Sequence, residues 1–314
     1  MRHAIVGIVF IAAAAFGSLP GIAAERQTTF GLIADGPYRT ALATRIARGV
    51  DHRDGIRILP VIGKSPAQNL ADLAEVRGID LALVPSDSLG FAGAQGLIRG
   101  ASGKFDYLVK LANLDIHVLA GPSIRSITDL KNKRVAVGSA TRASYETSAM
   151  LFAALGLSVT SLPLDSGEAI AAVKSGDAAA AVLIGVTPLP EVARLGRSDG
   201  LHLVAVPPRA ELAAFYAPSL IGAANYPALL EQGQSVETVS SSLVLAAVRW
   251  PQGSPQQAAL TRFATALFAS LLEDGAGPGI NLNAAVPGWT RSEASGLALE
   301  ALGRAPSLPT TQEN

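Results

Sequence analysis

Short apolar stretches alternate with amphipathic or alanine-rich stretches along most of the chain. The apolar stretches predict β-strands at residues 28–34, 56–62, 79–84, 115–120, 134–138, 158–163, 178–184 and 201–206. The stretches between and after them predict helices at residues 38–50, 66–76, 144–155, 167–174, 190–197 and 255–272. A repeated strand-then-helix order is typical of parallel sheets covered by helices, so the pattern predicts an α/β fold.

Two strand-then-helix segments divide the chain into two predicted lobes. They are LANLDIHVLAG at residues 111–121 and SSSLVLAAVRW at residues 240–250. A chain that enters a second domain once and returns once passes through two such hinge strands. The predicted lobes are residues 25–114 with 249–314 for lobe 1, and residues 115–248 for lobe 2.

Residues 1–24 are predicted to be a secretory signal peptide. Arg2 supplies a positive charge, residues 4–16 carry no charged side chain, and small residues end at a cleavage site after Ala24. The alternative interpretation is an uncleaved membrane anchor. Pro20 interrupts the run, however, and a membrane span needs about 20 apolar residues. The mature protein is therefore expected to be exported.

The composition excludes several classes of protein. The chain has 25 Lys and Arg against 25 Asp and Glu, so its net charge is zero, which argues against a nucleic-acid-binding surface. It has no cysteine, which removes disulfides, iron–sulfur clusters and thiol catalysis. Its 4 histidines are scattered, and no two of them stand three or four positions apart, so a helical His metal site is not expected.

Polar and charged residues follow the predicted strands at the points where helices begin. In parallel sheets these strand ends share one edge, and two lobes bring two such edges face to face across a cleft. Backbone N–H groups at helix starts favour anions. The candidate ligand-binding residues at these junctions are Asp35, Tyr38, Arg39, Lys64, Ser65, Asn69, Ser86, Asp87, Ser139, Thr141, Arg142, Ser144, Gly185 and Thr187.

Each junction also has a purely structural interpretation. Ser65 before Pro66 fits a helix cap, and Asp87 fits a helix N-terminus through the helix dipole. Residues 139–144 gather hydroxyls and Arg142 at the start of a predicted helix, which favours recognition of a carboxylate or phosphate. Both interpretations stay open for the other junctions.

The sequence offers no catalytic residues. His117 lies on a predicted hinge strand and His202 opens a strand, so neither stands at the carboxyl end of a strand, where a catalytic base would be needed. The G-x-S-x-G motif of serine hydrolases is missing. A binding protein is therefore favoured over an exported hydrolase.

Several segments carry a family likeness. They are ADGPYRTALATRIAR, GIDLALVPSDSLGFA, SITDLKNKRVAVGSA, GEAIAAVKSGDAAAAVLIGVTPLPEVARL and VETVSSSLVLAAVRW. Over residues 29–272 the chain resembles the extracytoplasmic solute-binding proteins of tripartite (TRAP) transporters, specifically the TAXI branch. The resemblance includes Ser86-Asp87 after a strand, a K-R-V-x-V-G motif ending at Gly138, and G-x-x-P-x-P from Gly185. The second of these motifs is shared by many type II periplasmic binding proteins.

The resemblance implies a fold and a function. The implied fold is a two-lobed type II periplasmic-binding-protein fold, in which each lobe is a mostly parallel sheet flanked by helices and two hinge strands join the lobes. The implied function is a periplasmic monomer that captures an amino acid or small organic acid. The implied partners are this ligand and the membrane subunits of a TRAP-type transporter, with no cofactor.

The chain departs from the family pattern at the cleft. Val186 stands where a second glycine is expected, residues 143–147 replace a Gly-rich loop, and residues 35–38 replace an aromatic-rich start. These side chains fill space where a small ligand would approach the backbone. The alternative function is therefore a periplasmic accessory or sensor protein on the same scaffold, with a degenerate or altered cleft that binds a protein partner or an atypical ligand.

Overall fold

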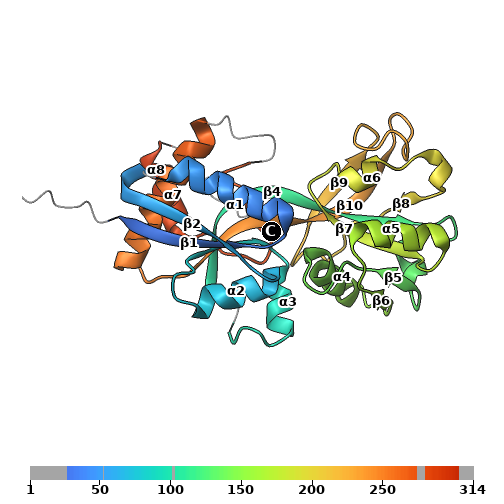
Figure 1. Ribbon diagram of the computed structural model, residues 1–314, viewed down its shortest axis with the longest axis horizontal. Coiled ribbons are helices and arrows are strands. Elements are labelled where there is room, and N and C mark those ends of the chain that lie inside the picture. Colours follow the sequence, from blue (N-terminus) through green and yellow to red (C-terminus); the bar gives the residue numbers. More distant parts are fainter. Residues whose placement is uncertain (1–26, 52, 101–102, 274–279, 304–314) are drawn as a thin grey trace, which may run out of the picture.

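Two lobes joined by long strands make up the part of the chain that the structure describes (Figure 1). The structure is a computed structural model and describes residues 27–51, 53–100, 103–273 and 280–303. The predicted signal peptide at residues 1–24 lies outside the described residues. No helix within these ranges has both the length and the apolar character needed to cross a membrane.

The strands within the described residues form one continuous sheet. Its order is β2-β1-β3-β10-β4-β7-β5-β6, with β8 beside β4 and β9 beside β10. The strands are β1 (Thr28–Ala34), β2 (Ile56–Ile62), β3 (Leu81–Pro85), β4 (Phe105–Ala120), β5 (Arg134–Ala136), β6 (Thr160–Leu162), β7 (Ala180–Gly185), β8 (His202–Val204), β9 (Ala217–Gly222) and β10 (Ser235–Val248). β2-β1-β3 and β7-β5-β6 are parallel, whereas β4 and β10 join their neighbours antiparallel.

Two long strands connect the lobes. The first part of β4 pairs with β10, and its last part, from Asp115 to Ala120, pairs with β7. β10 pairs with β9 from Ser235 to Ser240 and with β3 from Leu243 to Ala247. The predicted α/β class and the two hinge strands are confirmed. The residue limits predicted for the lobes stay a prediction, because each of these strands belongs to both halves of the sheet.

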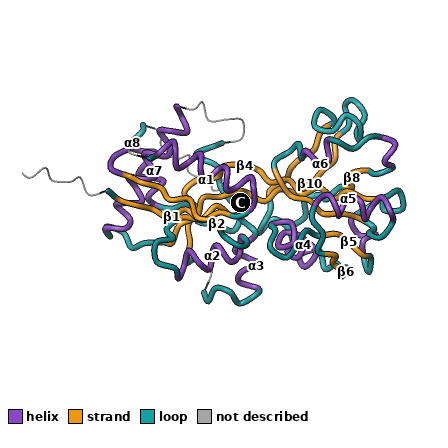
Figure 2. Tube along the Cα trace, in the orientation of Figure 1, coloured by secondary structure: helices purple, strands orange, loops and turns teal. Residues whose placement is uncertain are grey.

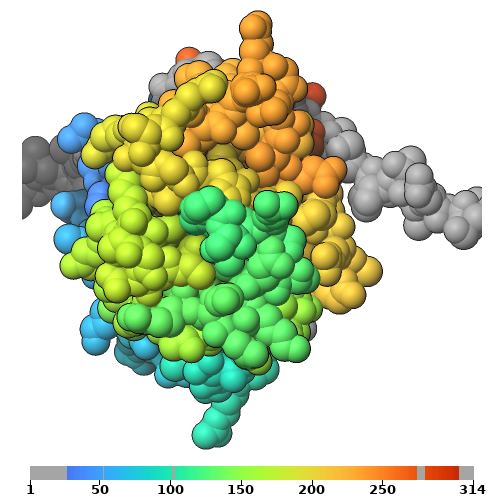
Figure 3. Space-filling view, turned by 90° about the vertical axis from the view of Figure 1, so that its right-hand side faces the viewer, coloured from blue at the N-terminus to red at the C-terminus, as the bar shows by residue number. Residues whose placement is uncertain are grey.

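Helices cover both faces of the sheet in each lobe (Figure 2). They are α1 (Gly36–Val50), α2 (Pro66–Glu75), α3 (Ser88–Ala94), α4 (Ala143–Ala154), α5 (Ser166–Ser175), α6 (Pro190–Ala193), α7 (Pro255–Glu273) and α8 (Glu293–Ala301). We call lobe 1 the half with β1 to β3, α1 to α3, α7 and α8. We call lobe 2 the half with β5 to β9 and α4 to α6. Figure 3 views the lobe 2 end of the molecule, where segments coloured green to orange form the surface.

Each lobe has two apolar layers, one on each side of its sheet. In lobe 1, α1, α7 and α8 cover one face, and α2 and α3 cover the other. In lobe 2, α4 covers one face, and α5 and α6 cover the other. All five residues of β3 are buried because helices lie on both its faces. The carboxyl ends of the parallel strands, and the helix starts that follow them, are thereby directed toward the space between the lobes.

Several expected elements differ from the structure. β4 starts at Phe105 rather than at residue 115, and β9 and α8 were not predicted. β5 ends at Ala136, because Gly138 has a φ of 80°, which takes the chain out of the extended conformation. The predicted helix at 190–197 ends early as α6, and Gly196 begins a separate 3₁₀ turn.

Phe263 provides a test of the lobe 1 core. Its side chain in α7 is fully buried, and its ring lies 5.2 Å from the ring of Phe30 in β1, measured between centroids. Phe263→Ala is expected to lower the free energy of unfolding by about 3–5 kcal/mol, because it leaves a cavity in this layer. Gln256→Ala, at an exposed position of the same helix, should stay within about 0.5 kcal/mol. Urea denaturation measures both values, and similar losses for the two variants would contradict the assignment of the core.

Candidate functional site

A pocket of about 540 Å³ lies between the lobes at the starts of four helices. α1 comes from lobe 1, and α4, α5 and the short α6 come from lobe 2. The lining residues are Asp35, Gly36, Pro37, Tyr38, Arg39, Gly138, Arg142, Ala143, Ser144, Asp165, Ser166, Leu183, Ile184, Pro190 and Glu191. Neither Asp35 nor Arg142 caps its helix with its side chain. The positive ends of α1 and α4 therefore face the pocket without a side-chain cap.

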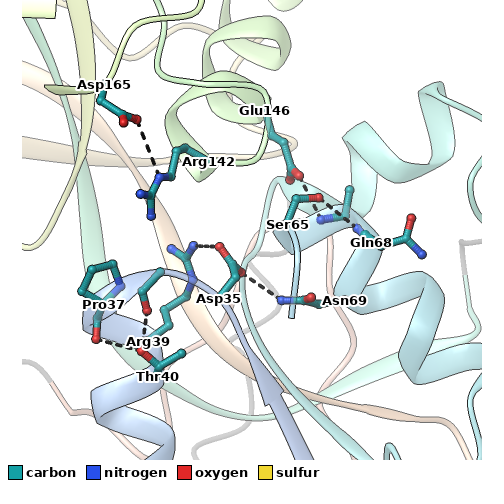
Figure 4. Close-up of polar contacts among 12 residues, drawn as sticks. Asp35, Pro37, Arg39, Thr40, Ser65, Gln68, Asn69, Arg142, Glu146 and Asp165 are labelled. Carbon is teal, nitrogen blue, oxygen red and sulfur yellow. Dashed lines mark hydrogen bonds and ion pairs between the residues drawn. The ribbon is translucent and has the colours of Figure 1, made fainter. Parts of the chain in front are cut away.

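Two guanidinium groups from opposite lobes converge in this pocket. A Cβ atom built on Gly36 would lie 3.5 Å from Nη2 of Arg39 and 3.7 Å from Nη1 of Arg142. Figure 4 shows the guanidinium group of Arg142 pointing from lobe 2 toward that of Arg39. Like charges this close repel each other unless negative charge lies near them. The arrangement is suited to an acidic group that would bridge both arginines.

The two arginines have unequal acidic partners. Arg39 is mostly buried and forms an ion pair with Asp35, which also accepts a hydrogen bond from Nδ2 of Asn69 at 2.9 Å. Nε of Arg39 is buried and has no hydrogen-bond partner among the described residues. Nε of Arg142 lies 3.8 Å from Oδ1 of Asp165, too far for a hydrogen bond, and both side chains are largely exposed. Arg142 therefore keeps most of its capacity for a further anion.

The start of α2 lies beside this pocket and is occupied from the other lobe. The backbone N–H of Ala67 in α2 donates a 3.0 Å hydrogen bond to Oε1 of Glu146, which belongs to α4. Figure 4 shows the Glu146 side chain directed toward Ser65. Burial raises the pKa of Glu146 to about 7, against the opposing effects of the Ala67 N–H and of the hydroxyls of Ser88 and Ser65. Glu146 is 1% exposed.

A second polar contact crosses between the lobes at Asp87. Oδ1 of Asp87 accepts a 2.7 Å hydrogen bond from Oγ of Ser241 in β10. Oδ2 accepts a 3.0 Å hydrogen bond from the hydroxyl of Tyr216, which packs in a lobe 2 core layer. Asp87 is fully buried, and burial raises the pKa of its carboxyl. Asp87 stands at the N-terminus of α3, as the sequence suggests, but its side chain makes these contacts and no capping hydrogen bond.

Apolar contacts complete this side of the cleft. The rings of Phe91 in α3 and Tyr145 in α4 meet edge to face, 6.3 Å apart between centroids. A Cβ on Gly90 would lie 2.8 Å from Cε of Met150 and 2.9 Å from Cε1 of Phe215. A side chain at position 90 would therefore have to displace the end of Met150 in α4 and the ring of Phe215.

A hydrogen-bonded network holds the loop after β7. Asp115 accepts hydrogen bonds from the hydroxyls of Thr187, at 2.5 Å, and Ser219, at 2.7 Å. His117 is fully buried, and its Nε2 lies 2.9 Å from the Tyr226 hydroxyl. Burial lowers the pKa of His117. Thr187 also lies 3.3 Å from this nitrogen, but its shorter contact is to Asp115. The network therefore positions the loop. Because the Thr187 hydroxyl donates its hydrogen bond to Asp115, His117 is not placed to act as a general base for it.

The predicted site residues separate into groups. Those that line the pocket are Asp35, Tyr38, Arg39, Arg142 and Ser144. Those held in polar contacts rather than in the lining are Asn69, Ser86, Asp87 and Thr187, of which Thr187 is only partly buried. Those placed outside the lining are Lys64, Ser65, Ser139, Thr141 and Gly185. The predicted cap by Ser65 is confirmed, because its Oγ accepts a 3.3 Å hydrogen bond from the N–H of Gln68.

Three residues of the inter-lobe contacts were not predicted: Glu146, Tyr216 and Ser241. Two of them had a signal in the sequence. Glu146 is the only acidic residue of the helix ASYETSAMLFAA, and Ser241 lies in a run of three serines within the buried part of β10. Buried polar side chains need partners, so each was a candidate for a specific contact. Among the described residues, no group of three or more His, Asp or Glu side chains is arranged to hold a metal ion.

Comparisons with known proteins agree with this architecture. The model of the NMT1-like family matches residues 37–249, more than half of the chain. XAC2383 from Xanthomonas citri bound to ATP has 13% identity and a TM-score of 0.51, covering 90% of this chain and 92% of that chain. At this identity the likeness concerns the fold alone. No curated protein sequence matches the chain.

Two further solved structures have lower TM-scores. A TctC solute binding protein from Polaromonas has 16% identity and a TM-score of 0.46, covering 81% of this chain and 90% of that chain. The periplasmic aliphatic sulphonate binding protein SsuA from Escherichia coli has 16% identity and a TM-score of 0.43, covering 88% of this chain and 80% of that chain.

Tyr216→Phe tests the polar contact at Asp87. The substitution removes the donor to Oδ2 and leaves a buried carboxyl oxygen without it, so the free energy of unfolding should fall by about 1–3 kcal/mol. Tyr145→Phe is the matched control in the same lobe, because it keeps the ring that contacts Phe91. Thermal and urea unfolding measure both variants. Equal stability of the Tyr216→Phe variant and the wild type would contradict the contact.

Proposed function

The chain belongs to the NMT1-like family, and we propose that it is an extracytoplasmic solute-binding protein that captures a small organic anion by closing its cleft. The ligand class is a carboxylate or an amino acid. The convergence of Arg39 and Arg142 carries the proposal. The two guanidinium groups belong to different lobes, so an acidic group between them would stabilise the closed arrangement and have no equivalent site in the open one.

Closure follows from this difference in affinity. A ligand shifts an equilibrium between open and closed forms only by the ratio of its affinities for the two. In the open form, an anion would contact the start of α1 with Arg39, or the start of α4 with Arg142, but not both. The acidic residues of the pocket, Asp35, Asp165 and Glu191, would suit the amino group of an amino acid. A zwitterion therefore fits the charges of the lining as well as a simple organic acid does.

Delivery to a transporter completes the proposed role. We propose export by the signal peptide at residues 1–24, a periplasmic monomer, and handover to the membrane subunits of a TRAP-type transporter. The support is the sequence resemblance to the TAXI branch. The residue limits proposed for the lobes, residues 25–114 with 249–314 and residues 115–248, place one arginine on each side of the cleft.

A second function is favoured by one specific observation. The start of α2 is occupied by Glu146, and α3 and α4 are in contact through Phe91 and Tyr145. A scaffold that closes part of its own cleft suits an accessory or sensor protein that binds a partner or an atypical ligand. The two functions differ in whether a small acid changes the shape of the protein.

Arg142→Ala tests the solute-binding function. Calorimetry against a panel of amino acids and mono- and dicarboxylates should find a ligand with a sub-millimolar dissociation constant. Arg142→Ala should weaken it by at least about 10-fold, because it removes charge-assisted hydrogen bonds. Arg194→Ala, an exposed arginine of the same lobe that does not line the pocket, should bind like the wild type.

The outcome separates the two functions. Binding of an acid together with a smaller radius of gyration in solution scattering supports solute capture. An unchanged shape with every solute of the panel, and a protein that co-purifies, would support the accessory function and reject solute capture.

A further inference from the structure

The first turn of α2 has a carboxyl group as its neighbour, and that group comes from the other lobe. Oε1 of Glu146 accepts the N–H of Ala67, the second residue of α2. The two residues are 79 positions apart in the chain. Pro66, at the first helical position, has no N–H, so Ala67 is the first donor that the helix offers. Glu146 thus takes the place that an anion would take at this helix start.

The surroundings of Glu146 form a polar site in the interface. Its second oxygen, Oε2, is buried and has no hydrogen-bond partner within bonding geometry among the described residues. The hydroxyl of Ser88 is buried nearby and likewise has no partner there. Ser65 and Ser88 come from lobe 1, at the starts of α2 and α3. Lobe 1 therefore provides one N–H and two hydroxyls around a carboxyl group that lobe 2 supplies.

We propose that the N-terminus of α2 is a carboxyl-binding site whose ligand is built into the chain, namely the side chain of Glu146, and that its occupation holds this side of the cleft closed without solute. The proposal does not depend on which solute the protein captures. It assigns the anion site of α2 to an internal group and leaves the pocket at α1, α4 and α5 for an external one.

Packing alone does not account for a glutamate at this position. α4 also buries the apolar side chains of Ala143, Leu151 and Phe152 and the hydroxyl side chains of Thr147 and Ser148, but Glu146 is its only buried ionisable side chain. Burying an acid is costly unless it is paired, and a well-packed apolar side chain would serve the interface equally well or better. A glutamate that accepts a hydrogen bond from a helix N–H of the other lobe provides a directional contact. When the lobes separate, this contact is lost and water takes its place.

Proton binding should be coupled to this contact. Burial raises the pKa of Glu146 to about 7 from its ordinary value of 4.5. The electrostatic effect of Asp87 raises the pKa of Glu146 further. Asp87 is itself buried and hydrogen-bonded to Tyr216. Arg142, the N-cap residue of α4, lies one turn before Glu146. When the lobes separate, Glu146 is exposed and its pKa returns toward the ordinary value. The closed form therefore binds the proton more tightly, so closure is favoured at low pH and weakens as the pH rises toward and through 7.

The internal carboxyl also limits how many acidic groups a bound solute can place in the cleft. With the α2 site filled, the pocket offers one place for an acidic group, between Arg39 and Arg142. A second acidic group of a ligand would have to displace Glu146 from Ala67. This step rests on the proposed solute-binding function, whereas the internal contact does not.

Acetate provides the direct test, because acetate is the part of the side chain that Glu146→Ala removes. In the Glu146→Ala variant at pH 5, where the site favours a protonated carboxyl, 100 mM sodium acetate should raise the melting temperature by roughly 3 °C relative to 100 mM sodium chloride, given a dissociation constant of about 10 mM. Solution scattering should show a larger radius of gyration for the variant than for the wild type, and acetate should reduce it. The wild type and Glu211→Ala, which removes an exposed glutamate of lobe 2, should not respond to acetate.

Two results would overturn the proposal. One is an equal response of the Glu146→Ala variant to acetate and chloride. The other is a radius of gyration for this variant that equals that of the wild type. Solute calorimetry on the same samples is independent of both, so failure of the solute-binding function and failure of the internal site can be told apart.

Glu146→Gln tests the same contact by titration and does not depend on the folding of the alanine variant. Glutamine keeps an oxygen that can accept the Ala67 N–H and has no proton to lose in this range. Between pH 5 and pH 8 the folding equilibrium of the wild type should decrease by roughly 70-fold relative to that of Glu146→Gln, which follows from pKa values of about 7 and 4.5. Urea denaturation at each pH measures this ratio. Parallel pH profiles would show that Glu146 does not titrate in the interface, and would overturn the buried contact.

Discussion

Helices from both lobes direct their positive ends into one cleft, and this electrostatic constraint governs the contacts between the lobes. α1 and α2 follow parallel strands of lobe 1, and α4 and α5 follow strands of lobe 2. Each helix start carries backbone N–H groups without helical partners and a partial positive charge. Facing ends repel each other unless acidic groups lie between them. The carboxyl groups of Asp35, Glu146 and Asp165 fill this need unequally.

The inequality divides the cleft into a filled part and an open part. Around α2 and α3, Glu146 and Asp87 are buried and hydrogen-bonded across the lobes. Around α1, Arg39 has its own acidic partner, but Arg142 has only a distant and exposed one. The helix start without a close acidic partner is therefore that of α4, where the pocket lies. Both the proposed solute site and the internal carboxyl site follow from this distribution, since the external acid and the internal one would each meet the positive end of a different helix.

The sequence predicts the elements well where local patterns determine them. β1 and β2 have the predicted limits because apolar stretches end at turns, and α2 starts where Ser65 and Pro66 mark a helix start. Contacts between distant segments were beyond such patterns. Tyr216 and Asp87 are 129 residues apart. Nothing local indicates that they meet.

The division of the candidate site has the same origin. Arg39 and Arg142 could be predicted as charge-bearing residues at helix starts, because this depends only on local order. Whether a polar residue at such a start faces the pocket or packs against the other lobe depends on how the lobes approach. Ser86 illustrates this, since its hydroxyl contacts Ser241 and the backbone N–H of Ser242 rather than the pocket. The serine run of β10 crosses between the lobes at this point, so its position is set by the sheet as a whole.

The chemistry of the interface bears on how readily the lobes separate. The cores of the lobes are apolar, and exposing them to water would be costly in proportion to their area. The surfaces between the lobes instead combine a small apolar contact at Phe91 and Tyr145 with polar groups that water can satisfy once they part. Such an interface can be closed at rest and still open at modest cost. A solute that bridges Arg39 and Arg142 then needs to add only a small difference in free energy to keep it shut, which is the condition under which a binding protein can both capture its ligand and release it.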